Sequence, residues 1–209
     1  MSQLEYLIAL ISIIVGLGFT DLAQSLRELV RPSRRVKWHW LPLLWVANTF
    51  LIALQLWWVS FDVLQSEIFG RPLAFLPYLL LFVGLYLTCA FALPDLRWGD
   101  STSASDLRAT GEDELDLEAF YFSEEHRRWF FGTLIGLVFF GQIISIPLFL
   151  VQGKLTLFQA GITFGQNALL AALLAGLILT AKWWAHAGVG VLVFLGLMYT
   201  LGAGISPIG

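Results

Sequence analysis

The chain has 209 residues, of which 58% are hydrophobic and 13% are charged, and its formal net charge is −3. Soluble domains carry about 25% charged residues, so this composition excludes an ordinary soluble globular protein. The single cysteine, Cys89, excludes an intrachain disulfide and any site built from several thiolates. We therefore expect an all-α polytopic membrane protein that forms a single domain over residues 1–209, needs no cofactor and has no nucleic-acid partner.

Six stretches are long and apolar enough to cross the roughly 30 Å hydrocarbon core of a bilayer as helices. The N-terminus lacks a basic region and a cleavage site, so the first of them is expected to remain in place. Pro32 ends the first helix, and Pro72 and Pro94 bound the third. The predicted spans cover residues 4–26, 40–60, 73–93, 129–151, 157–181 and 187–205.

The segment from Arg27 to Trp40 is rich in cations and predicts the orientation of the bundle. Lys and Arg concentrate on the cytoplasmic side of membrane proteins, and alternate connections lie on opposite sides. Only Arg71 and Lys154 fall in connections of the other side. Both termini are thus predicted outside (N-out/C-out), as in a multi-pass protein of the inner (plasma) membrane. The cations assigned to the cytoplasmic side are Arg27, Arg31, Arg34, Arg35, Lys37, Arg97, Arg108, Arg127, Arg128 and Lys182.

The sizeable soluble segment, residues 95–128, is an acidic cytoplasmic loop that contains the sequence GEDELDLE. It ends in DLEAFYFSEEHRRWFF, where Ser123 is the predicted N-cap of the fourth helix. The acidic part is either a solvated face or folds against the basic turn formed by Arg31, Arg34, Arg35 and Lys37. Alternatively, the same cations contact anionic lipid headgroups.

Polar residues in four of the helices predict a vestibule that opens to the outside. Polar side chains within a membrane are costly unless they meet one another or water, so they mark a candidate pathway. The alternative is that they form hydrogen bonds between helices. No Asp, Glu, Lys or Arg occupies the predicted middle of a span, which disfavours a proton-coupled pump. The candidate residues are Glu5, Ser12, Asn48, Gln55, Gln142, Gln159, Thr163, Gln166 and Asn167.

Three histidines, His39, His126 and His186, are all predicted at the inner interface. Imidazole is a common metal ligand, so a shared metal or haem site is conceivable. However, the spacing matches no metal motif, and the chain contains no nucleophile elbow and no phosphate-binding loop. We therefore expect no metal and no enzyme activity.

Helices four to six contain small residues four positions apart, a spacing that lets helix backbones approach closely. The pattern predicts either the tightly packed part of the bundle or a subunit interface. The glycines concerned are Gly132, Gly136, Gly161, Gly165, Gly196 and Gly204.

The motifs GLGFTDL, WHWLPLLWV, WW at positions 57 and 58, and DLEAFYFSEEHRRWFF span most of the chain. On these motifs the chain resembles a family of small bacterial membrane proteins of about two hundred residues and six helices, for which no activity is implied. Two functions remain open. One is a passive channel or small-solute transporter, and the other is a non-catalytic accessory or scaffold subunit that contacts a membrane-complex partner or a second copy of itself.

Overall fold

The computed structural model describes residues 3–30, 35–94 and 114–204. In chain order, it contains α1 (Gln3–Val30), β1 (Arg35–Lys37), α2 (Trp40–Leu64), the 3-10 helix η1 (Glu67–Gly70), α3 (Pro72–Phe91), β2 (Glu114–Asp116), α5 (Leu117–Phe122), α6 (Glu124–Val151), α7 (Leu157–Leu179) and α8 (Trp183–Gly204). Six of these helices are long and apolar enough to span a membrane, which confirms the predicted all-α membrane bundle.

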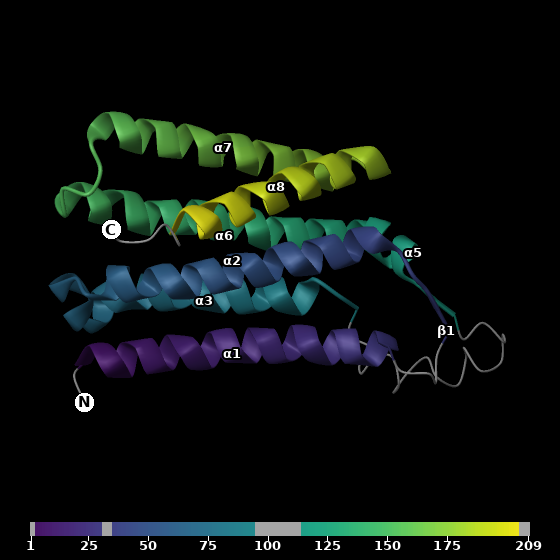
Figure 1. The fold of residues 1–209 in the computed structure, drawn as a ribbon, viewed down its shortest axis with the longest axis horizontal. Helices are drawn as coiled ribbons and strands as arrows, with labels where there is room; N and C mark the ends of the chain where they lie inside the picture. The colour runs from purple at the N-terminus through teal and green to yellow at the C-terminus, as the bar shows by residue number, and fades with distance from the viewer. Residues whose placement is uncertain (1–2, 31–34, 95–113, 205–209) are drawn as a thin grey trace.

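The six long helices run side by side (Figure 1). In the bundle α3 packs between α1 and α6, while α2 packs on α1 and α8. The helix α7 lies at the edge, packed mainly on α6 and only slightly on α8. Much of the surface of α7 is therefore not covered by the other described helices.

Local sequence signals explain where several helices begin. Pro72 is the first residue of α3, and the Ser123 side chain accepts a hydrogen bond from the amide of His126 at the start of α6. Ser123 is thus the N-cap that the sequence predicts. Gly153 has φ of +69° in the turn after α6, a conformation that favours glycine, and Thr156 opens α7 in a reciprocal capping box.

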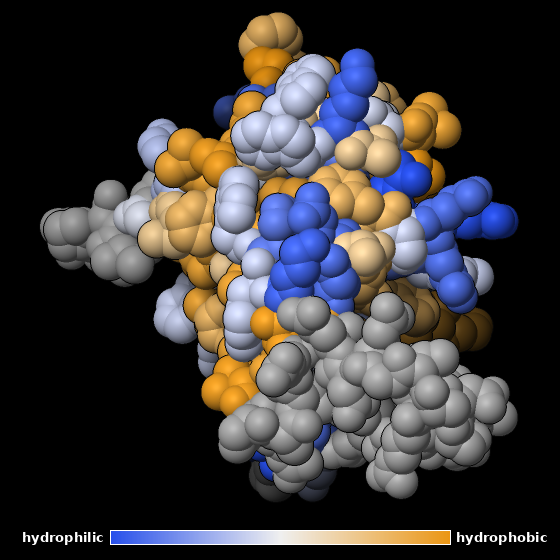
Figure 2. All heavy atoms as spheres, turned by 90° about the vertical axis from the view of Figure 1, so that its right-hand side faces the viewer, coloured by the Kyte–Doolittle hydropathy of each residue, from blue (hydrophilic) through white to orange (hydrophobic). Residues whose placement is uncertain are grey.

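The connections alternate between the two ends of the bundle, so that α1 starts and α8 finishes at the same end (Figure 1). We call the other end, where α1 finishes and α2, α6 and α8 begin, the basic end. Figure 2 looks onto this end and shows hydrophilic residues gathered at its centre with apolar residues around them. Five tryptophans at or near this end are about half exposed, as is typical of an aromatic belt at a membrane interface: Trp38, Trp40, Trp129, Trp183 and Trp184.

Two short strands join the basic turn to the acidic loop at the basic end. Strand β1 pairs in parallel with β2, with Val36 opposite Leu115 and Lys37 opposite Asp116. The Lys37 Nζ atom donates a 2.7 Å hydrogen bond to Asp116 Oδ2. This contact corresponds to the predicted meeting of the two segments, although its β-strand form was not predicted. Arg31, Arg34 and residues 101–105 of the loop lie outside the described residues.

Asp116 also begins α5, because its Oδ1 accepts hydrogen bonds from the amides of Glu118 (2.9 Å) and Ala119 (3.1 Å). The hydrogen bond from Lys37 and the bonds from these amides lower the pKa of Asp116. The pKa of Asp116 is lower in the folded chain than in the unfolded chain, where an Asp has a pKa of about 3.9. The charged carboxylate therefore stabilises the fold fully above this ordinary pKa. The stabilisation is lost as the pH falls through the lower pKa of the folded state.

Replacing Asp116 is therefore expected to open the strand pair and the start of α5. Asp116→Asn keeps a capping oxygen but loses the charge, whereas Asp116→Ala loses both, so amide exchange over residues 114–122 should increase in that order. Hydrogen exchange with mass spectrometry measures this, and in the unmodified chain protection should persist from pH 7 to about pH 4 and then fall. Equal protection in Asp116→Ala and the unmodified chain would contradict the assignment.

Three buried clusters form the interior. One lies around Ile11, Phe82 and Leu85, a second contains Trp45, Tyr121, Phe130 and Phe131, and a small third one includes Leu117 at the basic end. Trp45 is 1% exposed, and its ring meets those of Phe130 and Phe131 edge to face, with centroids 5.9 and 5.0 Å away. Aromatic contacts thus hold α2 against α6.

Candidate functional site

A buried hydrogen-bonded chain links four helices at the basic end. The Tyr121 hydroxyl lies 2.8 Å from His186 Nδ1, and His186 Nε2 lies 2.8 Å from the carbonyl oxygen of Thr180. A carbonyl only accepts, so Nε2 carries the hydrogen, and Nδ1 accepts from the tyrosine hydroxyl. His186 is 0% exposed, and both of its ring nitrogens are satisfied within the protein.

Arg127 completes this arrangement. Its Nη1 atom donates to the carbonyl oxygens of Ile178 (3.1 Å) and Thr180 (2.7 Å), which belong to the C-terminal end of α7. Helix C-termini carry unpaired carbonyls and a partial negative charge, which a guanidinium satisfies. We call Tyr121, Arg127, Thr180 and His186 the latch, because they connect α5, α6, the end of α7 and α8.

The polar groups of the latch hydrogen-bond to one another and so have a structural role. Burial raises the pKa of Tyr121, so its hydroxyl stays protonated and donates. His186 has no ring nitrogen left for a substrate or a metal ion. The arrangement therefore positions helices.

Tyr121→Phe should destabilise the bundle by about 1–3 kcal/mol, because it leaves Nδ1 of the buried His186 without a donor. Cys89 is 2% exposed and the only cysteine in the sequence, so a thiol-reactive fluorogenic dye reports thermal unfolding. Tyr199→Phe on α8 is the matched control, since Tyr199 is 77% exposed. The same unfolding temperature for both variants would refute the role of the hydroxyl.

The three histidines do not form a common ligand set. His39 accepts a 3.4 Å hydrogen bond from the amide of Leu41 and so caps α2, while His186 belongs to the latch. His126 lies near His186, and its ring is 5.5 Å from that of Tyr121. Within residues 3–30, 35–94 and 114–204, no group of three His, Cys, Asp or Glu residues is arranged to hold a metal.

Several residues of the predicted vestibule make contacts between helices. Asn48 Nδ2 donates to the carbonyl oxygen of Gly190 (3.0 Å), and Gln55 Nε2 donates to Thr200 Oγ1 (2.8 Å). Both bonds join α2 to α8. Ser12 Oγ accepts a hydrogen bond from Trp57 Nε1 (3.0 Å), which joins α1 to α2. These positions match the alternative of hydrogen bonding between helices.

The remaining candidates are spread over three other places. Glu5 is exposed in the first turn of α1, and Gln159 belongs to the capping box of α7. Gln142 is 6% exposed, and neither atom of its amide has a hydrogen-bond partner. On α7, Gln166 is exposed, and Thr163 and Asn167 are partly buried. None of the nine candidates lines the groove around Leu137, the groove around Trp129 or the groove around Phe50.

The predicted small-residue contacts are absent within the described bundle at five positions. A Cβ atom added to any of them would meet no other atom within 4 Å: Gly132, Gly136, Gly161, Gly165 and Gly196. The surroundings of Gly204 lie outside the described residues. The tight approach occurs instead at Gly190, where a Cβ would lie 2.9 Å from Leu44 Cδ2 and 3.4 Å from the Trp45 ring. Tight contact inside the bundle is therefore not the role of these five glycines, and a subunit interface remains as the predicted role of the two on α7, Gly161 and Gly165.

No family model matches the chain, and neither a curated protein nor a solved structure matches it. The fold and the side-chain contacts described above are therefore the basis of the functional argument. They define a multi-pass helical membrane protein.

Proposed function

We propose that this chain is a non-catalytic subunit of an inner-membrane complex and that α7 is the helix through which it contacts its partner. The single observation that carries the proposal is Gln166, an amide exposed near the middle of a helix that is apolar enough to span a membrane. An amide facing hydrocarbon is unfavourable unless another polar group meets it. A hydrogen-bonding side chain on a second transmembrane helix supplies such a group.

The surface around Gln166 suits close helix contact. Gly161, Gly165 and Gly176 are exposed on α7, and each has open space where a Cβ would lie. Small residues let a second helix approach until the backbones touch, and van der Waals packing then stabilises the pair in lipid. The partner is thus expected to be a transmembrane helix that presents an amide or hydroxyl beside a flat surface.

Native mass spectrometry of protein extracted into nanodiscs tests this proposal. The unmodified chain should retain a second polypeptide, either another copy of itself or a different subunit. Gln166→Leu and Gly165→Leu should lose it. Gly132→Leu is the matched control, because Gly132 is also exposed and open but lies on α6. Detection of the chain alone, without any second polypeptide, would refute the proposal.

A second candidate function, passive transport of a small solute, is favoured by unpartnered polar atoms inside the bundle. Both amide atoms of Gln142 and the Oδ1 atom of Asn48 are buried without hydrogen-bond partners. Buried polar atoms of this kind are normally satisfied by protein or water. Flux of water or small neutral solutes into liposomes should then fall in Gln142→Leu and Asn48→Leu variants. Flux equal to that of empty liposomes would exclude this candidate.

A further inference from the structure

A groove at the basic end combines aromatic walls with polar groups. It lies between the end of α3, the short helix α5 and the start of α6, and its volume is about 460 Å³. Its lining includes the rings of Phe91, Phe120 and Trp129 and the polar side chains of Ser123, Glu125 and His126. Among its described lining residues, Glu125 is the only one with a full charge at neutral pH. A groove of this kind favours a cationic group, which a carboxylate and aromatic faces both attract.

His126 lines this groove and carries an unsatisfied polar atom. The side chain is 7% exposed, and its Nε2 atom has no hydrogen-bond partner. The imidazole ring stacks on Phe130 with centroids 5.3 Å apart, and Phe120 lies 4.5 Å away, so neighbouring rings hold it in place. Buried polar atoms in proteins are nearly always hydrogen-bonded, so an unpaired one beside a groove points to a bound group.

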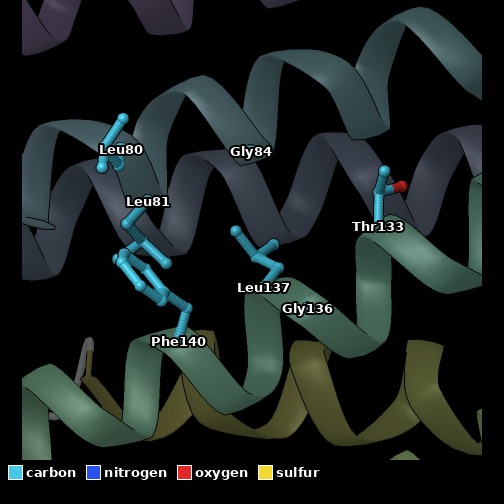
Figure 3. Close-up of a pocket in the computed structure, with 7 residues that line it drawn as sticks. All are labelled: Leu80, Leu81, Gly84, Thr133, Gly136, Leu137 and Phe140. Atoms are coloured by element: carbon cyan, nitrogen blue, oxygen red, sulfur yellow. The ribbon is translucent and has the colours of Figure 1, made fainter.

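A second, apolar groove lies along the same pair of helices, deeper in the bundle. It also lies between α3 and α6, has a volume of about 370 Å³ and is lined by Leu80, Leu81, Gly84, Thr133, Gly136, Leu137 and Phe140. Figure 3 shows Leu137 and Phe140 reaching from α6 toward α3, while Gly84 and Gly136 contribute no side chain. The missing side chains leave room for an alkyl chain.

The two grooves follow one seam between the same two helices. On α6, Glu125, Trp129, Thr133 and Gly136 are three or four residues apart and therefore share a face. Positions 91, 84 and 80 of α3 likewise share a face. At the basic end the seam is lined by polar and aromatic side chains. Deeper in the bundle its lining is apolar except for Thr133.

We propose that this seam binds one phospholipid with an ammonium headgroup from the leaflet at the basic end. The ammonium lies against the carboxylate of Glu125 and the faces of the aromatic rings. His126 hydrogen-bonds to an oxygen atom of the lipid, and one acyl chain occupies the groove between α3 and α6. This site is separate from the exposed face of α7, so it does not depend on the proposed subunit role.

Lipid retention measured by native mass spectrometry tests the headgroup assignment. The protein is stripped of lipid in detergent and titrated with phosphatidylethanolamine or phosphatidylglycerol that carry the same acyl chains. The unmodified chain should hold one phosphatidylethanolamine molecule about fivefold more strongly than phosphatidylglycerol. Glu125→Gln should remove this preference, and Glu124→Gln, the matched control from the same turn outside the groove lining, should keep it. Equal retention of both lipids, or the same loss in both variants, would overturn the proposal.

The acyl-chain part of the site is tested with two glycine variants of α6. Gly136→Leu should fill the apolar groove and abolish retention of phosphatidylethanolamine. Gly132→Leu is the control, because both positions are exposed and open but Gly132 does not line the groove. Thermal labelling of Cys89 checks that both variants fold. The Glu125→Gln variant tests the same site without a change in packing, because Glu125 is exposed. Undiminished binding in a folded Gly136→Leu variant would contradict the seam.

Phosphatidylcholine distinguishes the two ways in which an ammonium group can be held. Binding as strong as that of phosphatidylethanolamine assigns the headgroup to cation–π contacts, which need no N–H donor. Binding of phosphatidylethanolamine alone assigns it to hydrogen bonding with Glu125. Both results support an ammonium site, whereas stronger binding of phosphatidylglycerol than of either lipid would overturn it.

Discussion

Trp45→Ala is expected to lower the stability of the bundle more than any other single truncation of a side chain. Trp45 is 1% exposed and meets Phe130 and Phe131 edge to face, so alanine leaves a large cavity between α2 and α6. Such a truncation costs roughly 3–5 kcal/mol in water-soluble proteins. In a membrane the cavity and lost van der Waals contacts remain, while the water-transfer share is smaller, so we expect about 2 kcal/mol or more.

The temperature at which Cys89 reacts with a thiol dye measures this effect. Trp58→Ala is the control, since Trp58 belongs to the same helix but is 68% exposed. The Trp45 variant should react at a clearly lower temperature than both the control and the unmodified chain. Equal unfolding temperatures for the two tryptophan variants would show that the aromatic cluster does not hold α2 against α6.

Gly190→Leu is expected to separate α8 from α2. At Gly190 even a Cβ atom would lie 2.9 Å from Leu44 Cδ2 and 3.4 Å from the Trp45 ring. Overpacking of this kind costs about 1–3 kcal/mol. The displacement would also break the hydrogen bond from Asn48 to the Gly190 carbonyl oxygen, and hydrogen bonds between membrane helices contribute about 0.6 kcal/mol on average.

Gly188→Leu and Gly196→Leu are matched controls on the same helix, because an added Cβ meets nothing within 4 Å at either position. Only the Gly190 variant should show a lowered unfolding temperature. A further check is the double variant Asn48→Ala with Gly190→Leu. If the two substitutions act on one contact, their combined effect should be smaller than the sum of the separate effects.

The membrane helices were predictable because length and hydrophobicity alone decide whether a segment can span a bilayer. Capping residues also allowed some helix boundaries to be predicted, since Ser123 is the N-cap of α6, as the sequence indicates. The predicted sixth span began at residue 187, but α8 starts earlier, at Trp183. Trp183 and Trp184 lower the mean hydropathy at this point, but tryptophans at an interface can also belong to the helix. A boundary drawn from hydropathy therefore misses the first turn of α8.

The contacts at the basic end were less predictable because they depend on how distant segments meet. The opposite charges of the two segments suggested that they meet, but three-residue strands such as β1 and β2 leave no periodic pattern. The buried pair of Tyr121 and His186 was missed for a related reason. FYF ahead of a span is typical of an interfacial aromatic belt. The middle ring is buried because α5 packs on α2 and α6 and its tyrosine meets His186 of α8.

Polar residues within the spans show the same limit. Their spacing identifies the helix face on which they lie, but it does not reveal the group that they meet. Asn48 and Gln55 contact α8, whereas Gln166 faces outward from α7. The glycine pattern is equally ambiguous, because contact inside the bundle and contact with another subunit require the same spacing.

Photo-crosslinking in native membranes tests most directly whether α7 is covered by a partner helix. A benzophenone amino acid is placed at Leu169, which is 63% exposed on α7, and, as a control, at Ile143, which is 68% exposed on α6. We expect the probe at Leu169 to give a protein adduct, of a second copy or of another subunit, and the probe at Ile143 to give lipid adducts alone. Lipid adducts alone from both positions would contradict the proposed role of α7.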